Sequence, residues 1–217
     1  MYHLKAIIIG AGIGGLTTAI AMQQAGYTVE IYDKAQALRP AGAGISLWSN
    51  GVKVLNRLGL GDRLAALGGT MNRMEYRSDR DELLSAIDLR PLIHTVGQRP
   101  YPVARTELQA MLLAVAGPER VQLQKRCVAV EATAEHITAI FADGQRATGD
   151  VLVGADGIHS EVRRYVLGRQ VVPRYADYVN WNGIVDAQPG LCDPDNWVLY
   201  VGQSKRASMM PIGGDRF

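Results

Sequence analysis

The sequence predicts an α/β protein in which a parallel sheet with crossover helices is interrupted by β-rich segments. Three observations support this prediction. An apolar run over residues 4–9 is followed by a glycine-rich turn, a helical pattern and a second apolar run over 28–32. A third apolar run, over 150–154, leads into another turn and a helix-cap serine. Strand patterns separated by polar turns recur in 70–100 and 174–217.

The amino-terminal segment reads as a strand, a glycine turn and a helix predicted over 16–25. Gly10, Gly12 and Gly15 fit the pattern G-x-G-x-x-G directly after the β-branched run. In such a turn the first glycine permits the tight bend, and the second lets a diphosphate approach the backbone. The third lets helix and strand pack closely. The helix start then offers free N–H groups and a positive dipole end, so the pattern predicts a nucleotide-binding βαβ unit.

The second strand of this unit, over 28–32, ends in Asp33. An acidic side chain at this place can accept hydrogen bonds from the two hydroxyls of an adenosine ribose. The alternative is an α/β core without a nucleotide, with an accidental glycine cluster and a solvated Asp33. The order of strand, turn, helix, strand and acid favours nucleotide binding.

The elements after this unit are less regular. Residues 35–51 read as a loop because proline and glycine recur in them. A short helix is predicted over 52–58. A longer helix is predicted over 106–116, beginning with a capping box of Thr106 and Gln109.

Several further strands are expected from apolar and β-branched patterns. They are predicted over 71–76, 83–89, 121–123, 127–132, 137–141, 150–154, 178–185, 197–201 and 207–211. The pair Asp143-Gly144 predicts a tight turn that joins strand 137–141 to strand 150–154. Residues 213–215 predict a last turn, after which a returning strand would have an unpaired edge. We therefore expect the chain to be the amino-terminal portion of a longer protein.

Composition excludes several classes of function. A net charge of +2 without a basic run argues against a nucleic-acid binder. Cys127 and Cys192, the two cysteines, lie far apart and suggest a reducing, cytoplasmic location. The four histidines form no ligand-spaced pair, so no metal site is predicted. No apolar run approaches membrane length, and we expect no membrane partner.

Three motifs occur in the order typical of one enzyme family. They are the glycine turn with Asp33, then Arg105 within the run 103–108, then Asp-Gly-x-x-Ser-x-Val-Arg at 156–163. Over essentially its whole length the chain resembles class A flavoprotein monooxygenases, the p-hydroxybenzoate-hydroxylase-like family. The resemblance implies an α/β fold with a Rossmann-like FAD-binding domain of the GR2 type and an inserted β-rich substrate domain.

The resemblance also implies the domain organisation. The FAD-binding domain would comprise residues 1–69 and 101–173, and the β-rich substrate domain 70–100 and 174–217. The family's later Gly-Asp motif, which closes over the flavin, and its long carboxy-terminal helices would lie beyond residue 217. Both domains are therefore expected to be incomplete, truncated at the carboxyl terminus.

The cofactor contacts of the family can be carried over residue by residue. The implied FAD-binding residues are Gly10, Gly12, Gly14, Gly15, Asp33, Lys34, Ser46, Arg105, Cys127 and Asp156. Gly14 and its neighbours would meet the diphosphate, Asp33 the adenosine ribose, and Lys34 the adenine end.

The remaining cofactor residues have more varied implied roles. Ser46 would lie on the loop passing the flavin, and Arg105 would bring a fixed cation to the ribityl–phosphate region. The backbone of Cys127 would approach the adenine, while its thiol is expected to be a small buried hydrophobe. Asp156 would support the diphosphate and the transient nicotinamide, or else only form the turn between strand and helix.

Segments 44–53, 175–183 and 205–211 resemble the urate hydroxylases within this family. On that resemblance Asn180 and Arg206 would bind the substrate, with Arg206 also catalytic. A guanidinium can hold a planar heterocyclic anion by two hydrogen bonds, each worth roughly 1.5–3 kcal/mol. An amide offers both a donor and an acceptor to a ring edge. The alternative is that Arg206 lies on a solvated strand face and Asn180 in a turn.

The implied reaction uses FAD, with NADH or NADPH as transient reductant, and O2 to hydroxylate a small aromatic or purine substrate. Urate 5-hydroxylation in purine catabolism is expected first. The alternatives are a phenolic-acid hydroxylase of the salicylate or 3-hydroxybenzoate type, and a truncated, non-catalytic nucleotide-binding fragment. A short-chain dehydrogenase would need Tyr-x-x-x-Lys, which none of the nine tyrosines provides. The choice between NADH and NADPH and the number of subunits stay open.

Overall fold

The computed structural model describes residues 4–38 and 42–217. The contacts between residues divide the chain into two compact units, each made of two separate segments of the sequence. The first unit comprises Met1–Pro40 with Gln109–Val179, and the second comprises Ala41–Leu108 with Asn180–Phe217.

These units differ from the predicted domains in where residues 42–69, 101–108 and 174–179 fall. The prediction grouped the first two segments with the cofactor-binding part, whereas the contacts group them with the second unit. It grouped 174–179 with the substrate part, whereas the contacts group them with the first unit. The predicted domains were defined by their roles toward cofactor and substrate, and that assignment stays a prediction.

The first unit is built on a parallel sheet of order β11-β1-β2-β7. Its strands are β1 (Lys5–Ile9), β2 (Thr28–Tyr32), β7 (Val121–Gln122) and β11 (Val151–Gly154). Ile8 pairs with both Ile31 and Val153, so β1 lies between two parallel neighbours. Its apolar residues are buried along four consecutive positions, as expected for a parallel strand covered on both faces.

The glycine turn joins β1 to helix α1 (Ile13–Gln24) under tight steric limits. Gly10 has φ +110°, and a Cβ there would lie 2.3 Å from the carbonyl oxygen of Ala155. A Cβ on Gly15 would lie 1.8 Å from the carbonyl oxygen of Gly10. Neither position can hold a side chain, because helix and strands approach one another too closely.

A second sheet of the first unit has the order β10-β9-β8 and is antiparallel. Its strands are β8 (Cys127–Ala132), β9 (Ile137–Phe141) and β10 (Arg146–Gly149). Phe141 packs with Ile7 and Ile9 of β1, which joins the two sheets in one core. The turn at Gly144 joins β9 to β10, so the prediction that it leads directly to strand 150–154 is wrong.

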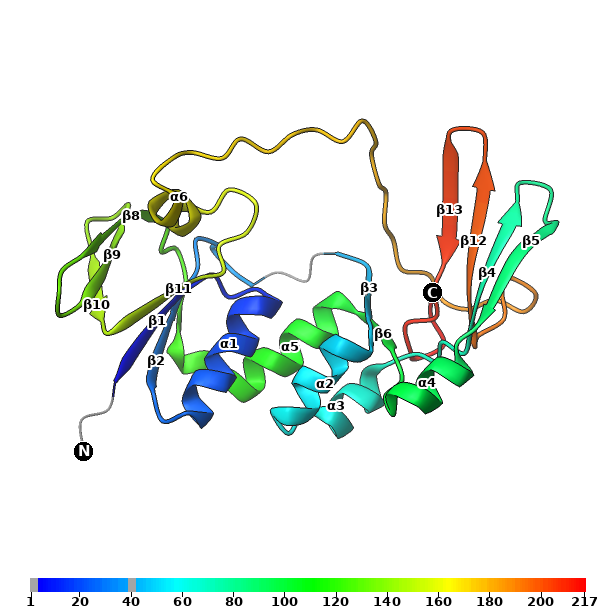
Figure 1. The fold of residues 1–217 in the computed structure, drawn as a ribbon, viewed down its shortest axis with the longest axis horizontal. Coiled ribbons are helices and arrows are strands. Elements are labelled where there is room, and N and C mark those ends of the chain that lie inside the picture. The colour runs from blue at the N-terminus through cyan, green and yellow to red at the C-terminus, as the bar shows by residue number, and fades with distance from the viewer. Residues whose placement is uncertain (1–3, 39–41) are drawn as a thin grey trace. The chain divides into compact units, whose positions relative to one another are not determined.

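Helices complete the first unit. They are α1, the part of α5 (Arg105–Ala116) from Gln109 onward, a short 3₁₀ turn (Pro118–Arg120) and α6 (Glu161–Leu167). Helices α1 and α5 run side by side in Figure 1, and Gln23 Nε2 donates to the carbonyl oxygen of Ala116 at 2.8 Å.

The second unit has two sheets. The larger has the order β13-β12-β4-β5, and the smaller pairs β3 with β6. In Figure 1 the hairpin of β12 and β13 stands beside that of β4 and β5, with β12 parallel to β4. The strands are β3 (Gly44–Leu47), β4 (Arg73–Ser78), β5 (Leu83–Asp88), β6 (Tyr101–Ala104), β12 (Asn196–Gly202) and β13 (Lys205–Met209). The helices are α2 (Ser49–Arg57), α3 (Gly61–Leu67) and α4 (Arg90–Val96).

Several further sequence predictions are wrong. Residues 35–51 are not all loop, because β3 and the start of α2 fall within them. The strand expected over 178–185 is absent. The capping box is also wrong, because α5 begins at Arg105 and the Gln109 side chain bonds elsewhere. Helices α3 and α4 were not predicted.

The last residues have partners. Phe217 and Val185 exchange two backbone hydrogen bonds of 2.9 Å, against the expectation of an unpaired edge. Arg216 Nη1 lies 2.8 Å from Glu107 Oε1.

Two negative findings apply to the described ranges alone. Within residues 4–38 and 42–217, no helix combines the length and apolarity needed to cross a membrane. Over the same ranges, no cluster of three or more His, Cys, Asp or Glu side chains could hold a metal ion.

Candidate functional site

A cavity of about 650 Å³ lies in the first unit. Its walls are formed where β1 and β2 end, where β8 begins, and by the segment that follows β11. Ligands of open parallel sheets bind at the carboxyl ends of the strands, so the cavity lies where this fold accepts them. Six of the predicted cofactor residues line it: Gly10, Gly12, Asp33, Lys34, Cys127 and Asp156.

The amino terminus of α1 is open toward this cavity. Gly12 is its N-cap residue, with φ −75° and ψ −179°, and no side chain caps the helix. A Cβ built on Gly12 or on Gly14 would meet no atom within 4 Å. The first N–H groups of a helix have no partner inside it, and no acidic side chain occupies this first turn. These residues therefore fit an anionic group such as a diphosphate.

The amino terminus of α6 lines the same cavity but is already capped. The Ser160 hydroxyl donates to Asp156 Oδ1 at 2.5 Å and accepts the N–H of Arg163 at 2.9 Å. Asp156 Oδ2 accepts the N–H of Glu161 at 2.7 Å. The sequence prediction of Ser160 as a helix cap is confirmed. Asp156 acts as a second cap, and its predicted role toward the cofactor stays a prediction.

Asp33 is anchored beneath the glycine turn. Its Oδ2 accepts the N–H of Ala11 at 2.7 Å, and its Oδ1 accepts the N–H of Ala35 at 2.8 Å. A carboxylate has about four acceptor sites, so each oxygen can still accept one more hydrogen bond. The side chain is therefore held in a fixed orientation with capacity left for a hydroxyl donor.

The thiol of Cys127 is a poor nucleophile in this setting. Burial raises its pKa to about 11, and the nearby charge of Asp156 adds to the effect. The sulfur lies 3.5 Å from the carbonyl oxygen of Ala129. At neutral pH the group is an uncharged thiol, which agrees with the expected small hydrophobe.

Sequence reasoning missed two cations, one histidine and one tyrosine in the lining. Lys125 and Arg126 bring positive charge to the cavity, with Lys125 paired to Asp143, and His159 adds an imidazole. Tyr32 donates to Glu30 Oε2 at 2.6 Å, and burial together with this carboxylate raises its pKa. The basic pair directly before Cys127 is the signal that could have indicated the first two.

Two predicted cofactor residues, Ser46 and Arg105, fall in the second unit. The Ser46 Oγ atom is buried and has no hydrogen-bond partner within the described part of the chain. Such an orphaned hydroxyl fits a contact with a bound group. Arg105 begins α5, and a Cβ on Gly42 would lie 3.1 Å from its Cδ.

The two predicted substrate residues, Asn180 and Arg206, are exposed in the second unit. Asn180 lies in irregular chain rather than the expected strand, and its Nδ2 donates to Asn182 Oδ1 at 3.3 Å. Arg206 lies on β13 opposite Val201, which in turn pairs with Ser78 of β4. Since paired residues share a face, Arg206 lies on the face of the sheet that also carries Ser78.

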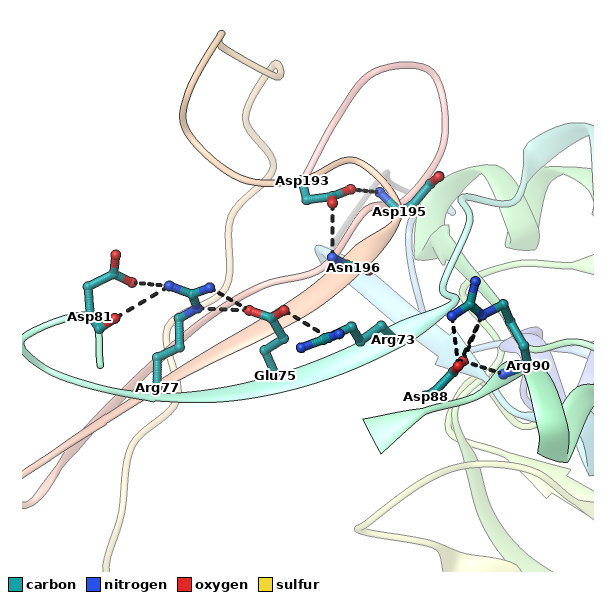
Figure 2. A network of polar contacts seen from close by, with 9 residues as sticks. All are labelled: Arg73, Glu75, Arg77, Asp81, Asp88, Arg90, Asp193, Asp195 and Asn196. Atoms are coloured by element: carbon teal, nitrogen blue, oxygen red, sulfur yellow. Dashed lines mark hydrogen bonds and ion pairs between the residues drawn. The ribbon is translucent and has the colours of Figure 1, made fainter. Parts of the chain in front are cut away.

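The opposite face of this sheet holds an ionic network that sequence reasoning missed (Figure 2). Glu75 is only 7% exposed and lies at the centre of the network. Its Oε1 lies 2.9 Å from Arg73 Nε, and its Oε2 lies 2.8 Å from Arg77 Nη2. Arg77 Nη1 lies 2.9 Å from Asp81 Oδ1, which extends the network to the hairpin turn. Alternation along β4 separates these charges from the face of Arg206.

Comparison with known proteins covers nearly the whole chain. FAD-dependent urate hydroxylase of Klebsiella pneumoniae is 46% identical over 215 residues, which are 99% of this chain and 56% of that protein. The urate hydroxylase of Mycolicibacterium vanbaalenii is 44% identical, with 99% of this chain and 55% of that protein covered. A 3-amino-4-hydroxybenzoate 2-monooxygenase of Streptomyces cremeus is 34% identical over 98% of this chain and 55% of that protein.

Solved structures of related enzymes also match the chain. Klebsiella pneumoniae HpxO complexed with FAD and uric acid matches with a TM-score of 0.94 and 44% identity. That match covers 99% of this chain and 55% of that one. The 2,6-dihydroxypyridine-3-hydroxylase of Arthrobacter nicotinovorans matches with a TM-score of 0.74 and 26% identity, covering 93% of this chain and 50% of that one.

The chain thus spans about half the length of the curated relatives it matches. These matches confirm the predicted α/β fold of FAD-dependent hydroxylases. The family model described as "FAD binding domain" matches residues 3–216. Together with the open amino terminus of α1 and the cavity it lines, this match identifies the chain as a member of the FAD binding domain family.

Proposed function

We propose that the protein carrying this chain is an FAD-dependent monooxygenase that hydroxylates a small heteroaromatic anion, with urate as the substrate, using NADH or NADPH and O2. The proposal rests above all on the 46% identity to a urate hydroxylase along 99% of the chain. The cavity in the first unit supports it independently, because its open helix terminus and anchored Asp33 suit an adenine dinucleotide.

The chain's own residues would hold FAD and orient it. The free N–H groups at the start of α1 would donate to the diphosphate, and Asp33 would accept hydrogen bonds from the ribose. The orphaned hydroxyl of Ser46 would gain a partner in the bound flavin. When bound, FAD supplies the redox chemistry that activates O2, and the protein supplies position and electrostatics.

Arg206 and Asn180 would bind the substrate. Arg206 is exposed and lies on the face of its sheet opposite the Glu75 network, so no carboxylate of that network competes for it. A guanidinium stabilises a urate anion by paired hydrogen bonds and keeps the ring carbon rich in electrons. The amide of Asn180 would complete recognition of the ring edge.

A substrate panel tests the proposal. Oxidation of NADH and of NADPH by the full-length protein is measured with urate, salicylate and 3-hydroxybenzoate, together with O2 consumption and product analysis. We expect urate to stimulate turnover most strongly, with one O2 consumed per hydroxylated product. Stimulation by the phenolic acids and none by urate would overturn the substrate assignment.

The same measurements decide between two other candidates. A phenolic-acid hydroxylase is supported by the 34% identity to a 3-amino-4-hydroxybenzoate 2-monooxygenase and would turn over salicylate or 3-hydroxybenzoate. A non-catalytic nucleotide-binding fragment would oxidise no reduced nicotinamide with any substrate. We further propose a cytoplasmic location, because Cys127 and Cys192 are both free thiols.

A further inference from the structure

The glycine turn is held by two side chains that bond to the same residue, Ala11. Asp33 Oδ2 accepts the N–H of Ala11 at 2.7 Å. Gln109 Nε2, from α5, donates to the carbonyl oxygen of Ala11 at 2.9 Å. Ala11 is fully buried, so both of its backbone polar groups need partners inside the protein. The two bonds supply them.

The bond from Gln109 has a consequence for the next residue. The carbonyl of Ala11 and the N–H of Gly12 belong to one planar peptide unit, and no cis peptide bond occurs in the described chain. In a trans unit these two groups point in opposite directions. Fixing the carbonyl oxygen on Gln109 therefore directs the N–H of Gly12 away from α5. Gly12 lines the cavity, and open space surrounds its Cβ position.

The orientation of this peptide unit must be fixed by a hydrogen bond because the turn is rich in glycine. Gly10 and Gly12 flank Ala11, and glycine permits backbone rotations that other residues resist. A rotation of the Ala11–Gly12 peptide unit would turn a carbonyl oxygen toward the cavity, where an anion would be repelled. The hydrogen bond from Gln109 opposes that rotation.

We propose that Gln109 is a positioning residue that aims the N–H of Gly12 at the diphosphate of the cofactor. The inference rests on the proposed function only in taking FAD as the ligand. Gln109 reaches the ligand through the peptide unit, with no contact of its own, so its loss lowers FAD affinity through geometry.

Gln23 offers a matched control. Its Nε2 also donates to a backbone carbonyl, that of Ala116, at 2.8 Å. This bond joins α5 to the last turn of α1, at the end of that helix far from the glycine turn. Gln109 and Gln23 are both partly buried. Substitutions at Gln23 therefore report the cost of losing such a bond away from the turn.

The experiment compares Gln109→Glu, Gln109→Leu and Gln23→Glu in the full-length protein, with the dissociation constant of FAD measured by flavin fluorescence. In Gln109→Glu the protonated carboxyl group can donate to the Ala11 carbonyl, whereas the carboxylate repels that oxygen. We expect FAD binding by Gln109→Glu to weaken about tenfold near pH 8 and to recover toward pH 5. Gln109→Leu weakens binding at both pH values, and Gln23→Glu and wild type change little between them.

The outcomes separate this inference from the proposed function. Wild-type protein that binds no FAD overturns the function itself. Wild-type protein that binds FAD, alongside Gln109 variants of equal affinity, overturns the positioning role alone. A loss of affinity shared equally by Gln23→Glu, with the same pH dependence, also overturns it, because the effect would then be one of general stability.

Discussion

Asp33 and Ala11 are joined by a hydrogen bond of 2.7 Å, from the Ala11 N–H to the Asp33 carboxylate, across the base of the glycine turn. The same carboxylate accepts the N–H of Ala35 at 2.8 Å. One side chain thus orders the turn that would meet the diphosphate and the strand end that would meet the ribose. With the proposed roles, recognition of the two parts of the cofactor would be coupled through this carboxylate.

Replacing Asp33 by alanine is expected to affect both stability and binding. The buried N–H of Ala11 would lose its acceptor, which costs roughly 1–3 kcal/mol of unfolding free energy. FAD affinity would also fall, by more than the loss of folding stability can explain. Asp150→Ala is the control, because Asp150 accepts a backbone N–H from Lys5 outside the cavity. Urea denaturation and FAD titration of both variants check this, and equal FAD affinities would contradict it.

Gly12 and Gly15 are expected to respond to alanine in opposite ways. A Cβ on Gly12 meets nothing within 4 Å, and its φ of −75° suits alanine. Gly12→Ala should therefore fold normally yet bind FAD at least about tenfold more weakly, because the methyl group occupies the space of the diphosphate. Gly15→Ala should instead lower the melting temperature, because its Cβ would lie 1.8 Å from the Gly10 oxygen. Thermal unfolding and FAD titration separate the two effects. An unchanged FAD affinity in Gly12→Ala would place the diphosphate elsewhere.

Arg206→Gln is expected to abolish most urate turnover while FAD affinity stays unchanged. A charge-assisted hydrogen bond is worth roughly 1.5–3 kcal/mol, so its loss predicts a decrease of about ten- to a hundredfold in kcat/KM. Lys205→Gln is the matched control, because Lys205 neighbours Arg206 on β13 and points to the other face. Steady-state kinetics with urate in both variants provide the measurement. Wild-type kinetics in Arg206→Gln would exclude the role.

The thiol of Cys127 should resist alkylation at neutral pH. Burial raises its pKa to about 11, so the thiolate is scarce below that value. Because the folded-state pKa lies above the unfolded one, the thiol lowers stability as pH rises between them and has no effect at lower pH. Iodoacetamide labelling in a Cys192→Ser background, followed by mass spectrometry, should be slow near pH 8 and faster above pH 10. Rapid labelling near pH 8 in folded protein would contradict this.

Local sequence signals were sufficient to predict the first βαβ unit and two strands of the antiparallel sheet. The strand predicted over 28–32 agrees with β2, and the predicted strands 127–132 and 137–141 agree with β8 and β9. The glycine turn and the Ser160 cap were also correct, because steric limits and capping bonds act within a few residues. The same motifs carried the family resemblance that implied FAD, and the family match agrees with it.

Other features depend on partners distant in the chain. Residues 178–185 have strand-forming side chains, but within the described chain they form no strand and only Val185 makes backbone hydrogen bonds, to Phe217. The polar stretch Arg146–Gly149 becomes β10 because β9 pairs with it. The amide of Gln109 bonds to Ala11, far from it in sequence. Glu75 has its ion-pair partners Arg73 and Arg77 two residues away, but it lies between Val198 of β12 and Ala86 of β5, and Val198 is distant in the chain. A strand or a buried charge needs a partner to satisfy its polar groups. Periodicity and motifs therefore reveal which segments can fold and bind a nucleotide, while packing selects the pairs and the orientation of each group in the cavity.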